Sequence, residues 1–178
     1  MKKLKKATYA IVFAVIFAST FQCASHKEIA TNFEQEVPFK VKPVTFQEWY
    51  AGIKVGGTGI NISIPITDVK DNVVINEVYF RNLKGQLIKR AGKYRAVLKH
   101  PSKVYTFAKA EKPADYPFTL QNDECVLSYT ENGQTKYHKI VTLNEVAGTY
   151  YEHGAPSVYT IETSSGMASL DGEEEEDN

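Results

Sequence analysis

The stretch Ile60-Asn61-Ile62-Ser63-Ile64-Pro65-Ile66-Thr67 decides the fold class of this 178-residue chain. Its isoleucines occupy every second position, and successive side chains of a β-strand point to opposite faces. One face of the strand is therefore apolar and the other polar. Pro65 lies on the polar face and cannot donate a backbone hydrogen bond to a neighbouring strand, so the pattern predicts a strand at the edge of a sheet.

Further strand-forming segments lie on both sides of this stretch. Before it, Val37, Phe39 and Val41 alternate with polar residues in the same way. After it, the residues that favour strands fall into the segments 72–81, 86–89, 93–99, 125–130 and 135–143. No window of helical length carries a sustained apolar stripe. The chain therefore predicts an all-β fold, either a single antiparallel β-sandwich or a small barrel-like domain.

The connections between these segments carry turn residues. Asn132-Gly133 supplies two residues that tolerate positive φ, as the type I′ turn of a two-residue hairpin requires. Residues 82–85 and Ala91-Gly92 predict two more turns. The glycine-rich stretch 52–59 predicts a wide hairpin turn, because it lacks the Lys-Ser/Thr pair and the following helix of a phosphate-binding loop. Residues 101–117 predict a long loop.

The N-terminus has the pattern of an export signal. Lysines near the start precede an uncharged, mostly apolar run from Ala7 to Phe21. As a helix this run would span roughly 22 Å, short of the ~30 Å hydrocarbon core of a bilayer. Cys23 follows at the position of the lipid-accepting cysteine in bacterial lipoproteins, although Gln22 replaces the usual small residue before it. Ordinary signal cleavage near Ala24 or Ser25, with Cys23 incidental, is one alternative, and an uncleaved membrane anchor is the other.

Composition and charge then divide the chain. The predicted parts are a lipoprotein signal peptide (1–22), a tether (23–36), a β-domain (37–163) and a disordered acidic tail (164–178). Residues 23–170 hold 17 basic and 15 acidic residues, a net charge of +2. A near-neutral body argues against nucleic acid as a partner, because nucleic-acid binding needs a concentrated basic face.

The second cysteine has two candidate fates. If Cys23 carries a lipid, Cys125 has no cysteine left to pair with; otherwise an oxidising compartment favours a disulfide between them. Alternation places Cys125 on the same strand face as Leu127 and Tyr129. We therefore predict a buried, inert core cysteine.

Two aromatic segments are the candidate ligand-binding residues. Trp49 and Tyr50 could stack on a sugar or a peptide, although their period-2 spacing favours the core. Tyr150, Tyr151 and His153 cluster on a predicted loop, where they could form a binding rim.

The sequence offers no catalytic, metal or cofactor constellation. A single histidine beside a single glutamate, as in Glu152-His153, lacks the spaced ligand pairs of a sequence-local zinc site. The sequence lacks the Gly-x-Ser-x-Gly elbow that would indicate a serine nucleophile. The pattern favours a non-enzymatic protein without a cofactor. The alternative is a hydrolase of envelope sugars or peptides that uses Glu152 and His153.

Four short motifs carry a family resemblance. They are Trp49-Tyr50-Ala51-Gly52, Gly56-Gly57-Thr58-Gly59, Val78-Tyr79-Phe80-Arg81 and Asp123-Glu124-Cys125-Val126. In these segments, within roughly residues 40–145, the chain resembles small uncharacterised lipoproteins of Bacteroidetes, of flavobacterial type. The resemblance implies export and lipidation, and it implies no activity.

These observations predict a lipid-anchored envelope protein whose β-domain binds an envelope protein or another ligand. A structural spacer of the envelope is a further alternative. Only one acidic residue, Glu28, follows closely after Cys23. Lipoproteins of Bacteroidetes that are exported to the cell surface typically have several acidic residues soon after the lipidated cysteine. This chain does not resemble them, so the expected location is the outer membrane, facing the periplasm.

Overall fold

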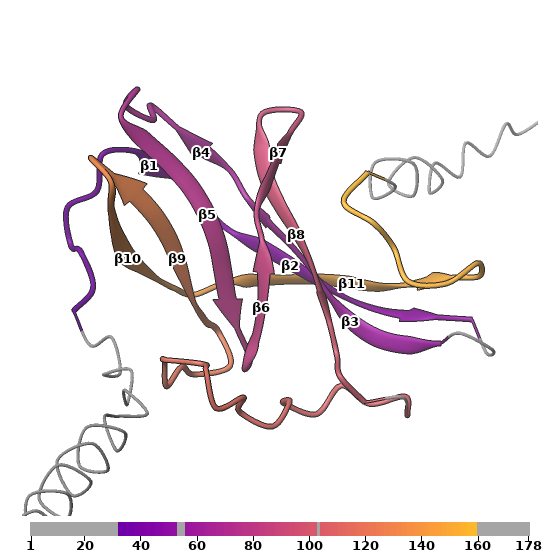
Figure 1. Cartoon of the computed structure of the whole chain (residues 1–178). Helices are drawn as coiled ribbons and strands as arrows, with labels where there is room; N and C mark the ends of the chain where they lie inside the picture. The colour runs from indigo at the N-terminus through magenta and orange to yellow at the C-terminus, as the bar shows by residue number, and fades with distance from the viewer. Residues whose placement is uncertain (1–31, 53–55, 103, 160–178) are drawn as a thin grey trace, which may run out of the picture.

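The computed structural model describes residues 32–52, 56–102 and 104–159, and all of its regular structure is β (Figure 1). One sheet has the order β11-β2-β3-β8-β7, with strands at Asn144–Tyr151, Thr45–Ala51, Gly57–Ile64, Lys93–Lys99 and Ile88–Arg90. The second has the order β10-β9-β5-β6, with strands at Gln134–Val141, Glu124–Glu131, Val73–Phe80 and Leu83–Gln86. β1 (Lys40–Val41) and β4 (Ile66–Thr67) form a short separate ribbon. The predicted all-β, sandwich-like fold is confirmed.

The hydrophobic core lies between the two sheets. All four isoleucines of the alternating stretch are buried in it, together with Cys125, Leu127 and Tyr129 from β9. Phe46 of β2 meets Phe80 of β5 across the core, with ring centroids 4.9 Å apart. The period-2 pattern thus buries one face of β3 completely, as a sandwich strand requires.

Chain crossings close the core along both of its sides. β6 continues into β7 through Leu87, and β10 continues into β11 through Thr142 and Leu143. Both leucines are buried. The backbone N–H of Leu87 donates to Asn76 O at 2.8 Å, and that of Leu143 donates to Asp123 O at 3.1 Å. Each edge of one sheet is therefore covalently continuous with an edge of the other.

The local turn predictions are confirmed at two hairpins and wrong at a third. Asn132-Gly133 joins β9 to β10 with φ values of 51° and 78°, and Ala91-Gly92 joins β7 to β8. The turn predicted at residues 82–85 lies one residue earlier, at Arg81-Asn82, and residues 83–85 belong to strand β6. Both of these residues have positive φ. The sequence does not predict this for Arg81, because arginine rarely adopts positive φ.

The prediction of an edge strand at Pro65 is also wrong. β3 pairs with β2 on one side and β8 on the other, so it lies inside its sheet. Pro65 falls in the gap between β3 and β4, where its carbonyl accepts a hydrogen bond from Lys42 N at 3.0 Å. A proline is tolerated here because the chain is leaving the sheet and needs no N–H for the ladder.

A second, smaller cluster covers the outer face of the four-stranded sheet. Residues from the segment between β8 and β9, which runs along one end of the molecule in Figure 1, pack on that face. The cluster consists of Tyr79, Tyr116, Phe118, Leu120 and Val126, with Phe33 and Tyr137 against it. Phe33 belongs to the predicted tether, and Glu34 N donates to Tyr137 O of β10 at 2.8 Å. The described end of the tether is therefore packed on the domain.

Candidate functional site

The outer face of the five-stranded sheet carries polar side chains arranged in a groove. Since alternate residues of β3 enter the core, Asn61 and Ser63 point to the other side. The register places Gln47 of β2 opposite Asn61, and Arg95 of β8 opposite Ser63. These residues, with Thr45 and Lys93, line a groove of about 280 Å³. That volume is close to the lower end of the range for small-molecule sites.

The groove combines cations and neutral hydrogen-bonding groups. Lys93 and Arg95 lie on its β8 side, and Gln47 and Asn61 supply amides on its β2 and β3 side. None of the nine described residues that line it is acidic. An arginine presents a planar set of N–H donors that matches a carboxylate or phosphate, and amides donate to and accept from hydroxyl groups. The groove is therefore chemically suited to an anionic, hydroxyl-bearing ligand.

Asn61 is the most constrained polar residue of the groove. Only 6% of it is exposed. Its Nδ2 donates to the Tyr151 hydroxyl at 3.1 Å and to Gln47 Oε1 at 3.4 Å. Its Oδ1 is buried and has no hydrogen-bond partner among the described residues. A buried acceptor without a partner costs roughly 1–3 kcal/mol.

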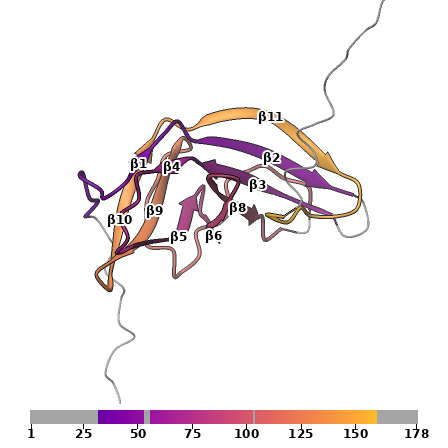
Figure 2. The same cartoon turned by 90° about the horizontal axis from the view of Figure 1, so that it is seen from above.

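The aromatic residues predicted as ligand contacts come together from two distant segments. β11 pairs with β2 in parallel, which sets Tyr150 opposite Tyr50. Figure 2 shows the two strands running side by side. The Tyr50 and Tyr150 rings lie 5.0 Å apart with 43% and 47% of each residue exposed. Trp49 and Tyr151 form a second, edge-to-face pair at 6.4 Å.

The two pairs have different surroundings. Trp49 is 1% exposed and packs against Gly59 on the groove side of the sheet, where a Cβ at Gly59 would collide with the indole. It is buried as its spacing predicts, but it is outside the main core cluster. Tyr50 follows the parity of Phe46 and points to the core side of the sheet. Its exposure shows that the core does not extend over this end of β2.

The predicted loop around Tyr150 and Tyr151 is a strand, which corrects the sequence prediction. Both tyrosines belong to β11, and the chain turns only at Glu152 and His153. These two side chains are exposed, and neither lines the groove. The described residues contain no group of three or more His, Cys, Asp or Glu side chains that could hold a metal ion.

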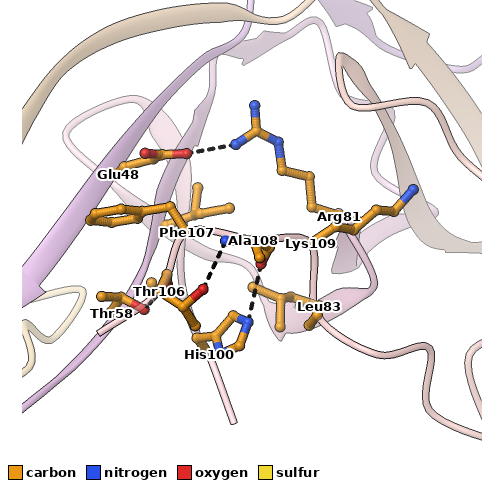
Figure 3. Close-up of a pocket in the computed structure, with 12 residues that line it drawn as sticks. Glu48, Thr58, Arg81, Leu83, His100, Thr106, Phe107, Ala108 and Lys109 are labelled. Atoms are coloured by element: carbon orange, nitrogen blue, oxygen red, sulfur yellow. Dashed lines mark hydrogen bonds and ion pairs between the residues drawn. The ribbon is translucent and has the colours of Figure 1, made fainter. Parts of the chain in front are cut away.

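A second hollow lies among residues of β2, β3 and the segment that follows β8 (Figure 3). Its volume is about 20 Å³, enough for about one water molecule. Glu48 Oε1 and Arg81 Nη1 meet at its wall at 2.7 Å, and the Arg81 guanidinium lies over the Phe46 ring. His100 accepts from Ser102 N and contacts Ala108 O. These contacts fix the loop, and the space is too small for a ligand.

Cys125 is the one described cysteine, and it lies far from any such surface. It is fully buried in the core, and burial raises the pKa of its thiol to about 12. The thiolate is the reactive form of cysteine, so the group is inert in the folded protein. The prediction of a buried core cysteine is confirmed. Cys23 lies outside the described residues.

The sequence contains a signal for the groove that net charge conceals. Between Val78 and Ala110 there are nine Lys and Arg residues and no Asp or Glu. This segment includes β6, β7 and β8, and so it supplies Lys93 and Arg95. The net charge of +2 averages this basic segment with acidic segments elsewhere. Counting charge in windows would have identified it.

Comparisons with protein-family models, with curated proteins and with solved structures find no match to this chain. In the part of the chain that the structure describes, no helix is long and apolar enough to cross a membrane.

Proposed function

We propose that this chain is a non-enzymatic binding protein of the bacterial envelope, anchored through lipidated Cys23, and that its β-domain binds acidic glycans. The single observation that carries the ligand class is the groove on the five-stranded sheet, with two cations, several neutral hydrogen-bonding groups and no acid among its lining residues. Carboxylates on sugar rings would pair with Lys93 and Arg95. Ring hydroxyls would meet the Gln47 amide and the Ser63 hydroxyl, which also line the groove.

The anchor and the domain are close together in this proposal. Phe33 packs on Phe118 at a centroid distance of 5.8 Å, so the domain begins there. The nine residues 24–32 between Cys23 and this contact reach at most roughly 30 Å when fully extended. The β10 edge of the sandwich would therefore stay near the bilayer. The resemblance to small Bacteroidetes lipoproteins supports export and lipidation, and the single acidic residue soon after Cys23 favours the outer membrane facing the periplasm.

Binding of a defined glycan tests the ligand class. The mature lipoprotein in detergent would be titrated calorimetrically with a galacturonate oligosaccharide and with the neutral galactose oligosaccharide of equal length. We expect binding of the acidic form, lost in the Lys93→Ala/Arg95→Ala variant. Lys70→Ala/Lys112→Ala is the matched control, because it removes two exposed positive charges outside the groove. Equal binding of both sugars, or equal loss in both variants, contradicts the proposal.

The anchor is tested separately by mass spectrometry of the mature N-terminus. A triacylated Cys23 is expected. A free N-terminus beyond Cys23 would contradict the lipid anchor and would leave the glycan site standing.

The same titration tests the alternative of a hydrolase that uses Glu152 and His153, two exposed residues that do not line the groove. This alternative predicts that the oligosaccharide is shortened during the titration, and that Glu152→Gln abolishes the shortening. Chromatography of the recovered sugar distinguishes the two functions, since a binding protein returns the oligosaccharide intact.

A further inference from the structure

We infer that the acidic C-terminal tail of this chain docks on the basic outer face of its own five-stranded sheet and competes there with ligand. The competition with ligand rests on the proposed function, whereas the docking of the tail does not. The occupant is the run Asp171–Asp177, which holds six carboxylates in seven residues. The docking surface is a row of outward-facing cations, which we call the basic stripe. It consists of Arg90, Lys93, Arg95 and Lys99.

Strand register defines the basic stripe. Ala96 and Leu98 of β8 are buried in the core, so the odd-numbered residues Lys93, Arg95 and Lys99 point outward. Arg90 lies directly opposite Lys93 in the β7–β8 hairpin, and opposed residues share a face. The inner part of the stripe lines the groove. An anion bound along the stripe would therefore occupy the site proposed for the ligand.

The path of the chain brings the tail to this place. The Arg90 guanidinium lies over the ring of Tyr159, 4.8 Å from its centroid. Tyr159 is the last described residue, so the chain leaves the described structure at the end of the basic stripe. A cation over an aromatic face contributes about 0.5–1 kcal/mol at an exposed site, which favours this exit point.

The lengths match. Eleven residues, 160–170, separate Tyr159 from the acidic run. A linker of eleven residues reaches roughly 17–20 Å on average, and at most roughly 40 Å. From Lys93 to Lys99 the strand rises roughly 20 Å, and a seven-residue extended tail covers roughly 23 Å. The acidic run can therefore lie along the whole stripe at the millimolar effective concentration that a short linker provides.

Charge complementarity favours this occupant over a random polar contact. The basic segment between Val78 and Ala110 contains no acid of its own, and the tail contains no base. Two other cations of that segment are already in ion pairs: Lys84 with Asp115 and Arg81 with Glu48. Both pairs lie away from the stripe. The attraction between tail and stripe should weaken with salt, because the screening length falls from about 10 Å at 0.1 M to about 3 Å at 1 M.

Zero-length carbodiimide cross-linking of the full mature chain tests the docking directly. This reagent joins a carboxylate to an amine only where the two are in contact. We expect cross-links from the Glu173–Glu176 carboxylates to Lys93 and Lys99, detected by mass spectrometry and reduced several-fold at 1 M salt. Lys70 and Lys112 are the matched controls. Equal cross-linking to the control lysines, or no cross-link to Lys93 or Lys99, overturns the inference.

A mixture of ¹⁴N- and ¹⁵N-labelled chains tells docking within one chain from docking between copies. Isotopically pure cross-links support docking of the tail on its own sheet, and mixed ones overturn it. The consequence for ligand is tested in a full-length variant with the six tail carboxylates changed to amides. We expect about tenfold tighter galacturonate binding, which corresponds to a tail docked in nine molecules of ten. Unchanged affinity with cross-links present overturns the competition. If no galacturonate binds, the cross-links still decide the docking and only the proposed ligand fails.

Discussion

The outer faces of the two sheets differ: one is covered by an apolar cluster, and the other carries a polar groove. On the four-stranded sheet, Phe118 and its aromatic neighbours bury the strand surface under chain from outside the sheet. On the five-stranded sheet, the corresponding surface carries Gln47, Asn61 and Arg95 around an open groove. A surface that is apolar must be covered, whereas a polar one can stay in contact with water and ligand. The difference separates a face that stabilises the fold from one that is available for binding.

The largest expected effect comes from uncovering the four-stranded sheet. Phe118 is buried and contacts the rings of Phe33, Tyr79 and Tyr137. Phe118→Ala should lower the free energy of unfolding by about 3–5 kcal/mol, the usual cost of emptying an aromatic core site. Urea denaturation measures it. Phe107→Ala, at an exposed phenylalanine, is the control and should cost far less. Equal losses would mean that the cluster is not a cover.

A smaller loss is expected from a tight contact beneath the open face. A Cβ on Gly59 would overlap Leu98 O and the Trp49 ring, so Gly59→Ala must displace the indole or β8. We expect a loss of about 1–3 kcal/mol by denaturant unfolding, as in overpacked cores. Gly148→Ala on β11 is the comparison, since only Glu48 O lies near its Cβ, at 3.3 Å. A neutral Gly59→Ala would show that Trp49 is not packed as described.

The aromatic cluster on the four-stranded sheet should also make the protein less stable at high pH. Burial, and for Tyr79 also its hydrogen bond to Glu77, raises the pKa of Tyr79 and Tyr116 well above about 10, the ordinary tyrosine value. As pH rises through about 10, the unfolded chain loses these protons before the native one does. Stability present below pH 10 is therefore lost above it, with a slope approaching 1.4 kcal/mol per pH unit for each group.

The double variant Tyr79→Phe/Tyr116→Phe should flatten this alkaline loss. Urea denaturation at pH 8, 10 and 11 measures the slope in the variant and in the parent chain. Phe107→Leu, at an exposed phenylalanine, is the control, because it removes no titrating group. An unchanged slope in the double variant would place the alkaline transition elsewhere in the chain.

The smallest expected effect on stability is at the groove itself. Lys93→Ala/Arg95→Ala should lower the free energy of unfolding by only about 1 kcal/mol or less, far below the loss from Phe118→Ala, while abolishing glycan binding. Thermal unfolding beside the calorimetric titration checks both. A loss as large as that of Phe118→Ala would show that the two faces are not divided between stability and binding.

Local patterns predicted the local structure well. The alternating isoleucines, the Asn132-Gly133 turn and the buried Cys125 depend on residues a few positions apart, and all three are confirmed. The patterns failed where the partner of a strand matters. Pro65 suggested that this strand lies at an edge, but β3 pairs with a strand on each side. Pro65 does not interrupt that pairing, because it lies just past the end of β3.

The candidate site was predictable only in part. Trp49, Tyr50, Tyr150 and Tyr151 were identified as aromatic candidates, but their convergence depends on a parallel pairing between strands about 100 residues apart in the chain. The groove was missed because Gln47, Asn61 and Arg95 come from three strands and form no motif in sequence. No local signal gives the register that brings them together, since register follows from which faces are buried.

By itself, then, the sequence determined where strands and turns form, which side of each strand is apolar, and where the charge is concentrated. These properties follow from side-chain alternation and from backbone conformations that each residue tolerates. Only the tertiary structure decided that β11 lies beside β2, that Phe33 and Phe118 cover one sheet, and that the other sheet stays open. Those outcomes depend on contacts between distant segments, whose formation balances buried surface against the entropy of closing long loops.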